Sequence, residues 1–248
     1  MIPAQKHNEL CHNEEMQRTS YFMDNPVENE YDMNSYSAKP TIIITGGDAG
    51  HMWYNTWDAN YFMKYGDFNV FLFDWRGFGE SQSWEINPKT LWLTEFRLDL
   101  EAAIEAVSKL PEVDSTKICA YGFSTGFYLT FATAVKNPKI KCIAGRGPMT
   151  NFEDVLKVYE GKREVFAPQN YSEELLPINC ADKLNCPIYM LVGELDDRTP
   201  VWMSEKVYAK INSPQKLQIV KGKGHGGIES DSSVLEEVCN FFKENLKK

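Results

Sequence analysis

The sequence predicts an α/β fold in which a mostly parallel central sheet carries helices on both of its faces. Short apolar runs of strand type alternate along the chain with segments of helical period. This alternation predicts parallel pairing, because each helix carries the chain back across one face of the sheet. The strands are expected at residues 41–45, 69–73, 140–144, 187–192 and 215–220, and from Lys117 to the turn before Ser124.

The helices between these strands are marked by apolar residues three or four positions apart. The strongest such period covers residues 91–110. Another helix should run from Ser124 to about Lys136. Further helices are expected at residues 55–65 and 201–211, and Ser230 or Asp231 should cap a helix at the C-terminal end.

The chain divides into an N-terminal arm and one larger domain. Residues 1–39 are polar and acidic without a sustained period, and they form either a loose arm or edge strands at 16–23 and 28–35. The α/β domain is expected at residues 40–248. Within it, residues 148–186 break into short mixed segments, which predicts a short cap rather than a large lid.

The composition disfavours several classes of function. The net charge of −9 disfavours binding to nucleic acid, whose phosphates need a basic face, and binding to an anionic membrane surface. No apolar run approaches the ~20 residues of a membrane span, and the N-terminus shows no apolar signal-peptide core. We therefore expect a cytoplasmic protein that acts on a small molecule, while the oligomeric state is left open.

The six cysteines form no C-x-x-C pair, which favours free thiols in a reducing compartment. A disulfide between Cys180 and Cys186 is the alternative. His7, Cys11 and His12 could contribute to a metal site only with a fourth ligand from elsewhere, so a solvated arm is the favoured interpretation. No metal and no organic cofactor is expected.

The clearest chemical signal is the pattern G-x-S-x-G at residues 122–126, with Ser124 at its centre. It lies between an apolar strand and a helix, where a sharp turn exposes the serine and strains its backbone. Glycines two positions before and after the serine leave room for this turn. The free N–H groups at the start of the helix favour negative charge beside the serine. The pattern predicts a nucleophile, and an ordinary glycine-flanked turn is the alternative.

A nucleophilic serine needs a base, which is usually histidine because imidazole titrates near neutrality. Of the four histidines, His225 is the candidate, because it follows the last strand in a glycine-rich loop. The acid that orients this base is expected after the strand at 187–192, where Asp196 is favoured and Glu194 and Asp197 are alternatives. The chain order of serine, aspartate and histidine is the one found with this type of turn.

An oxyanion that develops beside the serine needs two N–H donors. The amide of Thr125 is the first candidate, because it directly follows Ser124. The second is expected in the loop after the strand at 41–45, at Gly47 or alternatively at Asp48. A phosphate-binding loop at residues 46–50 is disfavoured, because neither the G-K-[ST] ending nor the G-x-G-x-x-G spacing is present.

Together these motifs resemble the α/β-hydrolase superfamily, and in particular its acyl-peptide hydrolases, serine aminopeptidases and dienelactone-hydrolase-like esterases. The resemblance implies Ser124 as nucleophile, His225 as base and Asp196 as acid. Thr45 departs from the family pattern, because a histidine is usual there, and Phe127 replaces a second glycine. The similar segments lie in family order at residues 45–47, 74–81, 110–114, 122–126, 181–187, 193–196 and 224–227.

The resemblance implies a serine hydrolase, and we expect it to cleave a small carboxylic ester through an acyl-serine intermediate. An amidase or aminopeptidase, a thioesterase, and a non-catalytic binding protein on the same scaffold are the alternatives. Asp74 and Arg76 are expected to pair structurally rather than to bind substrate. Five aromatic residues after the first loop predict either an acyl pocket or core packing, namely Trp53, Tyr54, Trp57, Tyr61 and Phe62.

Overall fold

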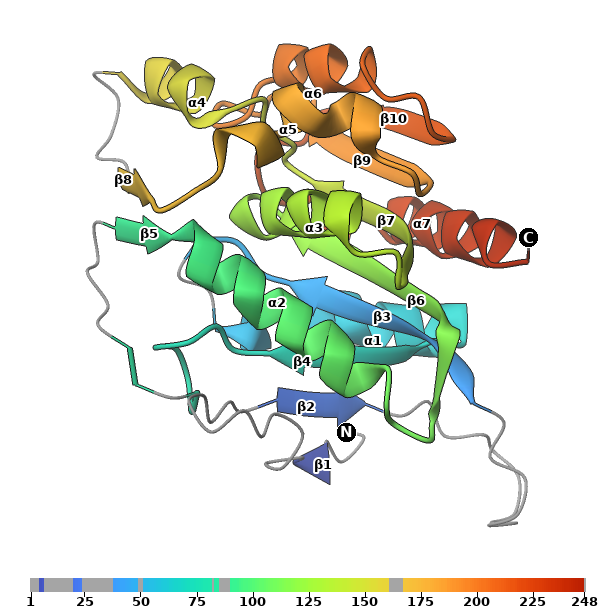
Figure 1. Cartoon of the computed structure of the whole chain (residues 1–248). Coiled ribbons are helices and arrows are strands. Elements are labelled where there is room, and N and C mark those ends of the chain that lie inside the picture. Colours follow the sequence, from blue (N-terminus) through green and yellow to red (C-terminus); the bar gives the residue numbers. More distant parts are fainter. Residues whose placement is uncertain are drawn as a thin grey trace.

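The computed structural model describes residues 5–6, 20–23, 38–48, 51–81, 83–84, 90–160 and 167–247. Eight strands of this described part form one sheet: β1 (Gln5–Lys6), β2 (Ser20–Met23), β3 (Lys39–Thr45), β4 (Asn69–Phe73), β6 (Val113–Phe123), β7 (Ile140–Arg146), β9 (Ile188–Gly193) and β10 (Gln215–Val220). Their order in the sheet is β1-β2-β4-β3-β6-β7-β9-β10 (Figure 1). The six strands from β4 to β10 in this order pair in parallel. At one edge, β2 pairs antiparallel with both β4 and β1. The predicted mostly parallel sheet is confirmed.

Helices cover both faces of this sheet, as the sequence predicts. Helices α2 (Leu93–Val107), α3 (Thr125–Lys136) and α6 (Val201–Tyr208) pack on one face, and α1 (Thr56–Gly66) and α7 (Ser232–Asn245) pack on the other. Figure 1 shows α2 and α3 in front of the sheet and α1 behind it. Asp231 caps α7 through its side chain, which accepts a hydrogen bond from the amide of Ser233.

Two apolar cores result from the alternation of side chains along each strand. In β3, Ile43 packs into the core beneath α2 and α3, whereas Ile42 and Ile44 pack into the core beneath α1 and α7. All three isoleucines are buried. Because both faces of the strand are covered, its sequence is a continuous apolar run rather than an alternating one.

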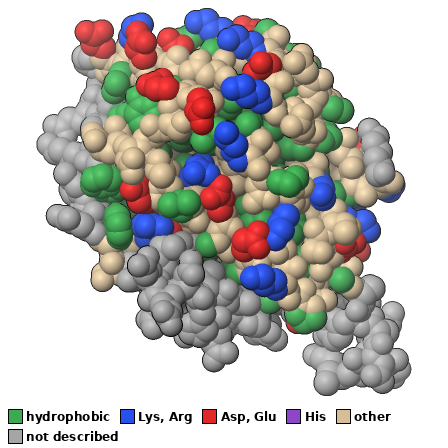
Figure 2. All heavy atoms as spheres, viewed as in Figure 1, with side chains coloured by type: hydrophobic (Ala, Val, Ile, Leu, Met, Phe, Trp, Pro, Cys, Tyr) green, Lys and Arg blue, Asp and Glu red, His purple; other side chains and the backbone are tan. Residues whose placement is uncertain are grey.

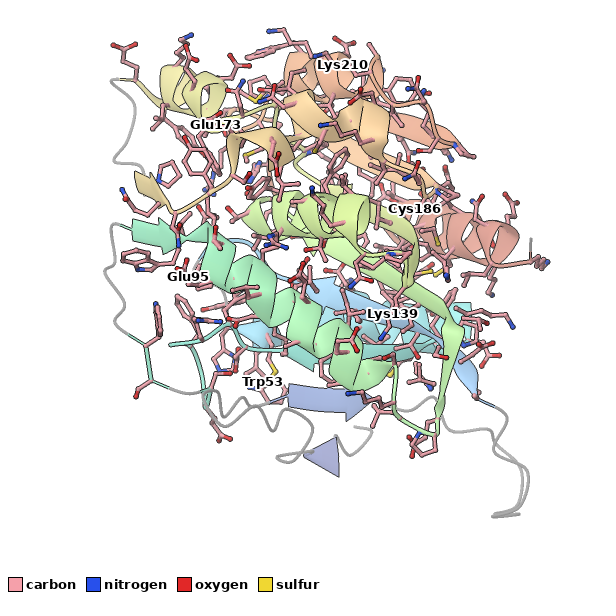
Figure 3. The ribbon with its side chains drawn as sticks, in the orientation of Figure 1. Trp53, Glu95, Lys139, Glu173, Cys186 and Lys210 are labelled. Atoms are coloured by element: carbon pink, nitrogen blue, oxygen red, sulfur yellow. The ribbon has the colours of Figure 1, made fainter. Side chains whose placement is uncertain are left out.

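The start of α2 differs from the prediction. Residues 90–92 form strand β5 (Thr90–Trp92), which pairs in parallel with β8 (Ala167–Gln169), so the helix begins at Leu93. The amide of Thr94 and the side chain of Glu95 bond to Asn170, just after β8. Figure 3 shows Glu95 in this place, at the start of α2. The pairing joins segments far apart in the chain, and the local helical period carries no sign of it.

The segment predicted to be a cap contains α4 (Phe152–Tyr159), α5 (Pro177–Cys180) and two short 3₁₀ turns, η2 (Glu173–Leu175) and η3 (Ala181–Lys183). It packs on α3, where the ring of Phe152 lies 5.4 Å from that of Tyr128. The extent of the cap, residues 148–186, and the division at residue 39 stay predictions. The strand candidate at 28–35 lies outside the described residues.

Other predictions concern cysteines, metals and membranes. Cys180 and Cys186 are free thiols, so the disulfide considered between them is not formed. His7, Cys11 and His12 lie outside the described residues, and no metal-binding group of three side chains occurs within the described ranges. Nor does any helix in the described part have the length and apolar character to cross a membrane. On the face seen in Figure 2, acidic and basic side chains are interspersed.

Candidate active site

Ser124 lies at the turn between β6 and α3, in a backbone conformation that few side chains adopt. Its φ is 52° and its ψ is −121°. The turn is held on both sides: the Ser124 amide donates to the carbonyl of Arg146 at 2.9 Å, and the amides of Phe127 and Tyr128 donate to the Ser124 carbonyl. Such strain persists only where the surroundings enforce it, and it often marks a functional residue.

The two glycines of the motif allow the close approach that this turn requires. A Cβ at Gly122 would lie 2.5 Å from Cα of Phe127, and one at Gly126 would lie 2.3 Å from the carbonyl oxygen of Gly46. Phe127 takes the place of a second glycine, and its side chain is buried. Its ring occupies space that Gly145 leaves open, since a Cβ there would lie 2.3 Å from the ring.

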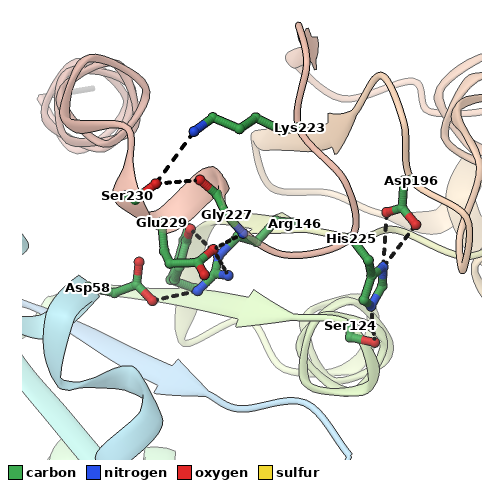
Figure 4. Close-up of polar contacts among 10 residues, drawn as sticks. Asp58, Ser124, Arg146, Asp196, Lys223, His225, Gly227, Glu229 and Ser230 are labelled. Carbon is green, nitrogen blue, oxygen red and sulfur yellow. Dashed lines mark hydrogen bonds and ion pairs between the residues drawn. The ribbon is translucent and has the colours of Figure 1, made fainter.

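The structure brings the three predicted catalytic side chains into one row. His225 Nε2 lies 3.0 Å from Ser124 Oγ, and His225 Nδ1 lies 2.9 Å from Asp196 Oδ2 (Figure 4). Both residues are buried: His225 is 7% exposed and Asp196 is 6% exposed. With Nδ1 directed at a carboxylate, Nε2 is left to accept a proton from the hydroxyl, which is the arrangement of a serine nucleophile and its base.

The surroundings of Asp196 favour its ionised form, although the carboxylate is buried. Burial alone would raise the pKa of this carboxyl, but the hydrogen bond and the charge of His225 act in the other direction. The amides of Arg198 and Thr199 also donate to Oδ1, at 2.9 and 2.8 Å. Together these contacts hold the pKa of Asp196 below its ordinary value.

The other two carboxylates of this loop are exposed, whereas Asp196 is buried against the imidazole. Glu194 is exposed and accepts a hydrogen bond from the amide of Gly222 at 2.9 Å. Asp197 is exposed. Of the three candidates that the sequence offers, Asp196 is therefore the one beside His225.

The loops after β9 and β10 are packed closely enough to join Asp196 to His225. A Cβ at Gly193 would lie 2.2 Å from the carbonyl oxygen of Gly224 and 2.3 Å from that of Lys223. The amide of Leu195 donates to the Lys223 carbonyl at 2.8 Å. Only glycine at position 193 permits this contact between the two loops.

The candidate oxyanion donors lie at the start of α3 and in the loop after β3, and these two segments contact each other. The hydroxyl of Thr125 donates to Asp48, which follows Gly47. Since Thr125 is the first residue of α3, its amide has no partner within the helix. Thr45 ties the first loop to the same helix, through bonds of 2.9 Å to the Gly126 carbonyl and 2.8 Å to the Thr130 hydroxyl. The threonine that replaces the usual histidine thus fastens β3 to α3.

The prediction for Asp74 and Arg76 needs a correction, because they do not pair with each other. Arg76 binds Asp99 of α2 instead, with Nη2 2.7 Å and Nε 2.9 Å from Oδ1. Asp74 accepts from the amide of Met52 at 2.7 Å, and its Oδ1 lies 3.6 Å from His51 Nδ1. Both residues hold the loop in place, but through partners that lie elsewhere in the chain.

The five aromatic residues after the first loop divide into two groups. Phe62 is fully buried in the core, and Tyr61 donates its hydroxyl to the Ser232 carbonyl at 2.7 Å. Trp53, Tyr54 and Trp57 are 57%, 80% and 64% exposed. Core packing therefore accounts for Phe62, but it does not account for Trp57.

Several residues of this site lie outside the motifs that the sequence analysis recognised. Thr199 donates its hydroxyl to Asp196 Oδ2 at 3.1 Å. Gly147, with φ of 70°, makes room for the imidazole, because a Cβ there would lie 2.8 Å from Cε1 of His225. Arg146 is a buried cation at the end of β7. The one sequence signal for it is an arginine close to the end of an apolar strand.

The fold and this arrangement of side chains define the class of protein: the chain is a serine-type α/β hydrolase. The comparison with protein families then gives a narrower placement. The model of the prolyl oligopeptidase family matches residues 53–248, and the chain belongs to that family.

Individual relatives are distant in sequence, and the solved structures among them share the fold. An uncharacterized protein of Mycobacterium tuberculosis is 26% identical over 210 residues, which are 83% of this chain and 70% of that protein. Among solved structures, a puromycin-hydrolyzing peptidase of M. tuberculosis aligns with a TM-score of 0.77 at 16% identity, over 98% of this chain and 39% of that chain. An esterase of Pyrococcus furiosus aligns with a TM-score of 0.76 at 18% identity, over 99% of this chain and 90% of that chain.

Proposed function

We propose that this protein cleaves a small carboxylic ester through an acyl-serine intermediate, with Ser124 as nucleophile, His225 as general base and Asp196 as the acid that orients it. The observation that carries the proposal is the unbroken row of contacts, 3.0 Å from Ser124 Oγ to His225 Nε2 and 2.9 Å from Nδ1 to Asp196 Oδ2. A serine hydroxyl becomes an effective nucleophile only when a base lies within such reach.

Acylation begins when Ser124 Oγ attacks the ester carbonyl carbon and its proton passes to His225 Nε2. The carbonyl electrons move onto oxygen, and the amides of Thr125 and Gly47 stabilise the oxyanion. Asp196 holds the imidazole in the required tautomer and stabilises the imidazolium. When the tetrahedral intermediate collapses, the alkoxide leaves, takes the proton from His225 and departs as the alcohol.

Deacylation repeats these steps with water. A water molecule gives a proton to His225 and attacks the acyl carbon, and the second tetrahedral intermediate expels Ser124 Oγ. The serine recovers the proton from His225, and the carboxylic acid is released. The same two donors serve both intermediates, because the oxyanion forms on the same carbonyl oxygen.

An ester is the proposed substrate because, of the candidate substrates, it is the easiest for a serine triad to cleave. An alkoxide is a better leaving group than an amide nitrogen, so a triad that cleaves amides also cleaves activated esters. A peptide or amide substrate is the second candidate, and membership of the prolyl oligopeptidase family favours it. The structural likeness to both an esterase and a peptidase supports hydrolysis without choosing between them.

The test compares turnover of purified protein on acyl p-nitrophenyl esters, aminoacyl p-nitroanilides and acyl-CoA thioesters. We expect turnover on short esters, and Ser124→Ala should lower kcat by about 10⁴-fold or more. Ser115→Ala is a matched control, because Ser115 lies exposed on the same strand β6. Efficient anilide cleavage with poor ester cleavage would replace the esterase by an amidase.

A non-catalytic binding protein on this scaffold is distinguished by a fluorophosphonate probe, which reacts covalently with an activated serine. We expect the folded wild-type protein to be labelled and Ser124→Ala to remain unlabelled. A folded wild-type protein that resists labelling would contradict the proposed nucleophile and favour the binding protein.

A further inference from the structure

Arg146 carries a buried positive charge next to the active site, and the mechanism above does not use it. Its side chain is about 4% exposed and lies on β7, the neighbour of the strand that leads to Ser124. Nη2 binds Asp58 Oδ2 of α1 at 2.6 Å, and Nη1 binds Glu229 Oε2 at 2.6 Å. Nε donates to the hydroxyl of Tyr121 at 3.1 Å. One guanidinium therefore joins β6, β7, α1 and the 3₁₀ turn η4 (Ile228–Ser230).

Glu229 continues this network into the loop that carries His225. The same Oε2 that binds Arg146 accepts the amide of Gly227 at 2.9 Å (Figure 4). The carbonyl of Gly227 accepts the hydroxyl of Ser230 at 2.8 Å. Gly227 follows His225 by two residues and has φ of 91°, so its peptide groups are held on both sides at the point where the loop turns. This anchor lies two residues beyond the imidazole in the same loop.

Arg146 also contacts the nucleophile through its backbone carbonyl, and its guanidinium lies over the ring of Phe123, which packs against the base. Its carbonyl accepts the amide of Ser124 at 2.9 Å. Its guanidinium lies 4.4 Å from the ring centroid of Phe123, and that ring lies 5.1 Å from the imidazole of His225. Phe123 is therefore in contact with both the cation and the base.

Stability alone is a weak explanation for such a buried group. Taking the Arg146 guanidinium and the Asp58 carboxylate out of water costs several kcal/mol per ion, and their attraction often does no more than offset that cost. Burial raises the pKa of Asp58 although Arg146 opposes it, whereas for Glu229 the effect of Arg146 and the Gly227 amide outweighs burial and the pKa is lowered. Glu229 is thus held as an anion at the point where the network meets the loop.

We propose that Arg146 is a positioning residue, which sets the place of His225 relative to Ser124 through Glu229 and Gly227. This proposal rests on the proposed function, because it assigns a role in bringing the base to the nucleophile. Asp58 has a different part. Its Oδ1 makes no hydrogen bond in the part of the chain that the structure describes, so the network ends there on α1, on the side away from the loop.

The difference between the two carboxylates supplies a matched comparison. Both bind the guanidinium at 2.6 Å, but only Glu229 passes the contact on to the loop. Glu229→Ala should lower kcat and the fluorophosphonate labelling rate by about 10- to 100-fold with little change in KM, since small displacements of a reacting group have effects of this size. Glu229→Gln keeps an acceptor oxygen for Gly227 and should recover most of the rate.

The control is Asp58→Asn, which should stay within about threefold of wild type in kcat even where its melting temperature falls as far as that of Glu229→Ala. If Asp58→Asn and Glu229→Ala lose kcat equally, and both losses follow the fall in melting temperature, the network has only a structural role and the proposal is wrong. Wild-type kcat in folded Glu229→Ala would also overturn the proposal. If Glu229→Ala does not fold, Glu229→Asp replaces it, because its shorter side chain cannot reach both partners, and the same outcomes decide.

Labelling of the wild-type protein distinguishes a failure of the proposed function from a failure of the positioning role. If the wild-type protein is not labelled at Ser124, the proposed function fails. If wild type is labelled and Glu229→Ala is labelled at the same rate, only the positioning role fails.

Discussion

At the scale of single residues, the site depends on a carboxylate that stays charged inside the protein. Asp196 is 6% exposed, yet it receives two backbone amides, the hydroxyl of Thr199 and the ring of His225. The partners compensate for the lost hydration, and they also fix the direction of the carboxylate. Its charge and its orientation therefore have the same cause.

The depressed pKa of Asp196 predicts how its contribution to stability depends on pH. A carboxyl whose pKa is lower in the folded state stabilises the fold above the unfolded-state pKa of about 3.9, and this contribution is lost as pH falls through the folded-state value. Urea denaturation of wild type and Asp196→Asn should therefore show a difference in unfolding free energy that shrinks as the pH falls from about 5 to below 4. A difference that stays constant across this range would contradict the ionised, hydrogen-bonded carboxylate.

At the scale of elements, the contact between the loops after β9 and β10 decides whether acid and base meet. Gly193 ends β9, and the backbone carbonyls of Lys223 and Gly224 pass over it. The loops are further joined by the amide of Glu194, which donates to the Val220 carbonyl at 3.0 Å. Two strands that are neighbours in the sheet thus deliver two side chains to one point.

Gly193→Ala should separate these loops, because the new Cβ would meet backbone atoms that cannot move without moving the whole loop. We expect a loss of about 1–3 kcal/mol in unfolding free energy, measured by urea denaturation. A fall in kcat should accompany it, since Asp196 and His225 are pushed apart. Gly224→Ala is the control, because the nearest atom to its Cβ lies 3.8 Å away. Equal effects of the two substitutions would count against loop contact as the cause.

At the scale of the whole molecule, two separate cores hold the helices to the sheet, and the active site lies at neither centre. In the core beneath α1 and α7, the ring centroids of Phe62 and Phe68 lie 6.2 and 6.1 Å from that of Phe242. The catalytic side chains come from loops at the carboxyl ends of β6, β9 and β10. We therefore expect the packing around Phe242 to affect stability more than catalysis.

Phe242→Ala should cost about 3–5 kcal/mol in unfolding free energy, because it removes a fully buried ring and leaves a cavity. Turnover per folded molecule should stay near that of wild type, since the site is built from other elements. Ile219→Ala is the control, because that side chain is 46% exposed on β10 and its loss should cost less than about 0.5 kcal/mol. A large loss of turnover in folded Phe242→Ala would mean that this core also supports the site.

Much of the fold follows from local patterns in the sequence. Strands β4 and β10 have the predicted bounds, and α2 differs from its prediction by a few residues at each end. Helical and strand periods report how side chains are buried within one segment, so they can be recognised without knowledge of the rest of the chain. The pairing of β5 with β8 left no local trace, and it was missed.

The sequence by itself determined the sheet, the serine turn and the histidine and carboxylate candidates, because each depends on residue types within a few positions of one another. Only the tertiary structure decided that Asp196 rather than Glu194 faces His225, and that Arg76 binds Asp99 rather than Asp74. It also decided that Arg146 reaches both sides of the site. These contacts join segments that are far apart in the chain, and their geometry depends on how closely the folded backbones approach.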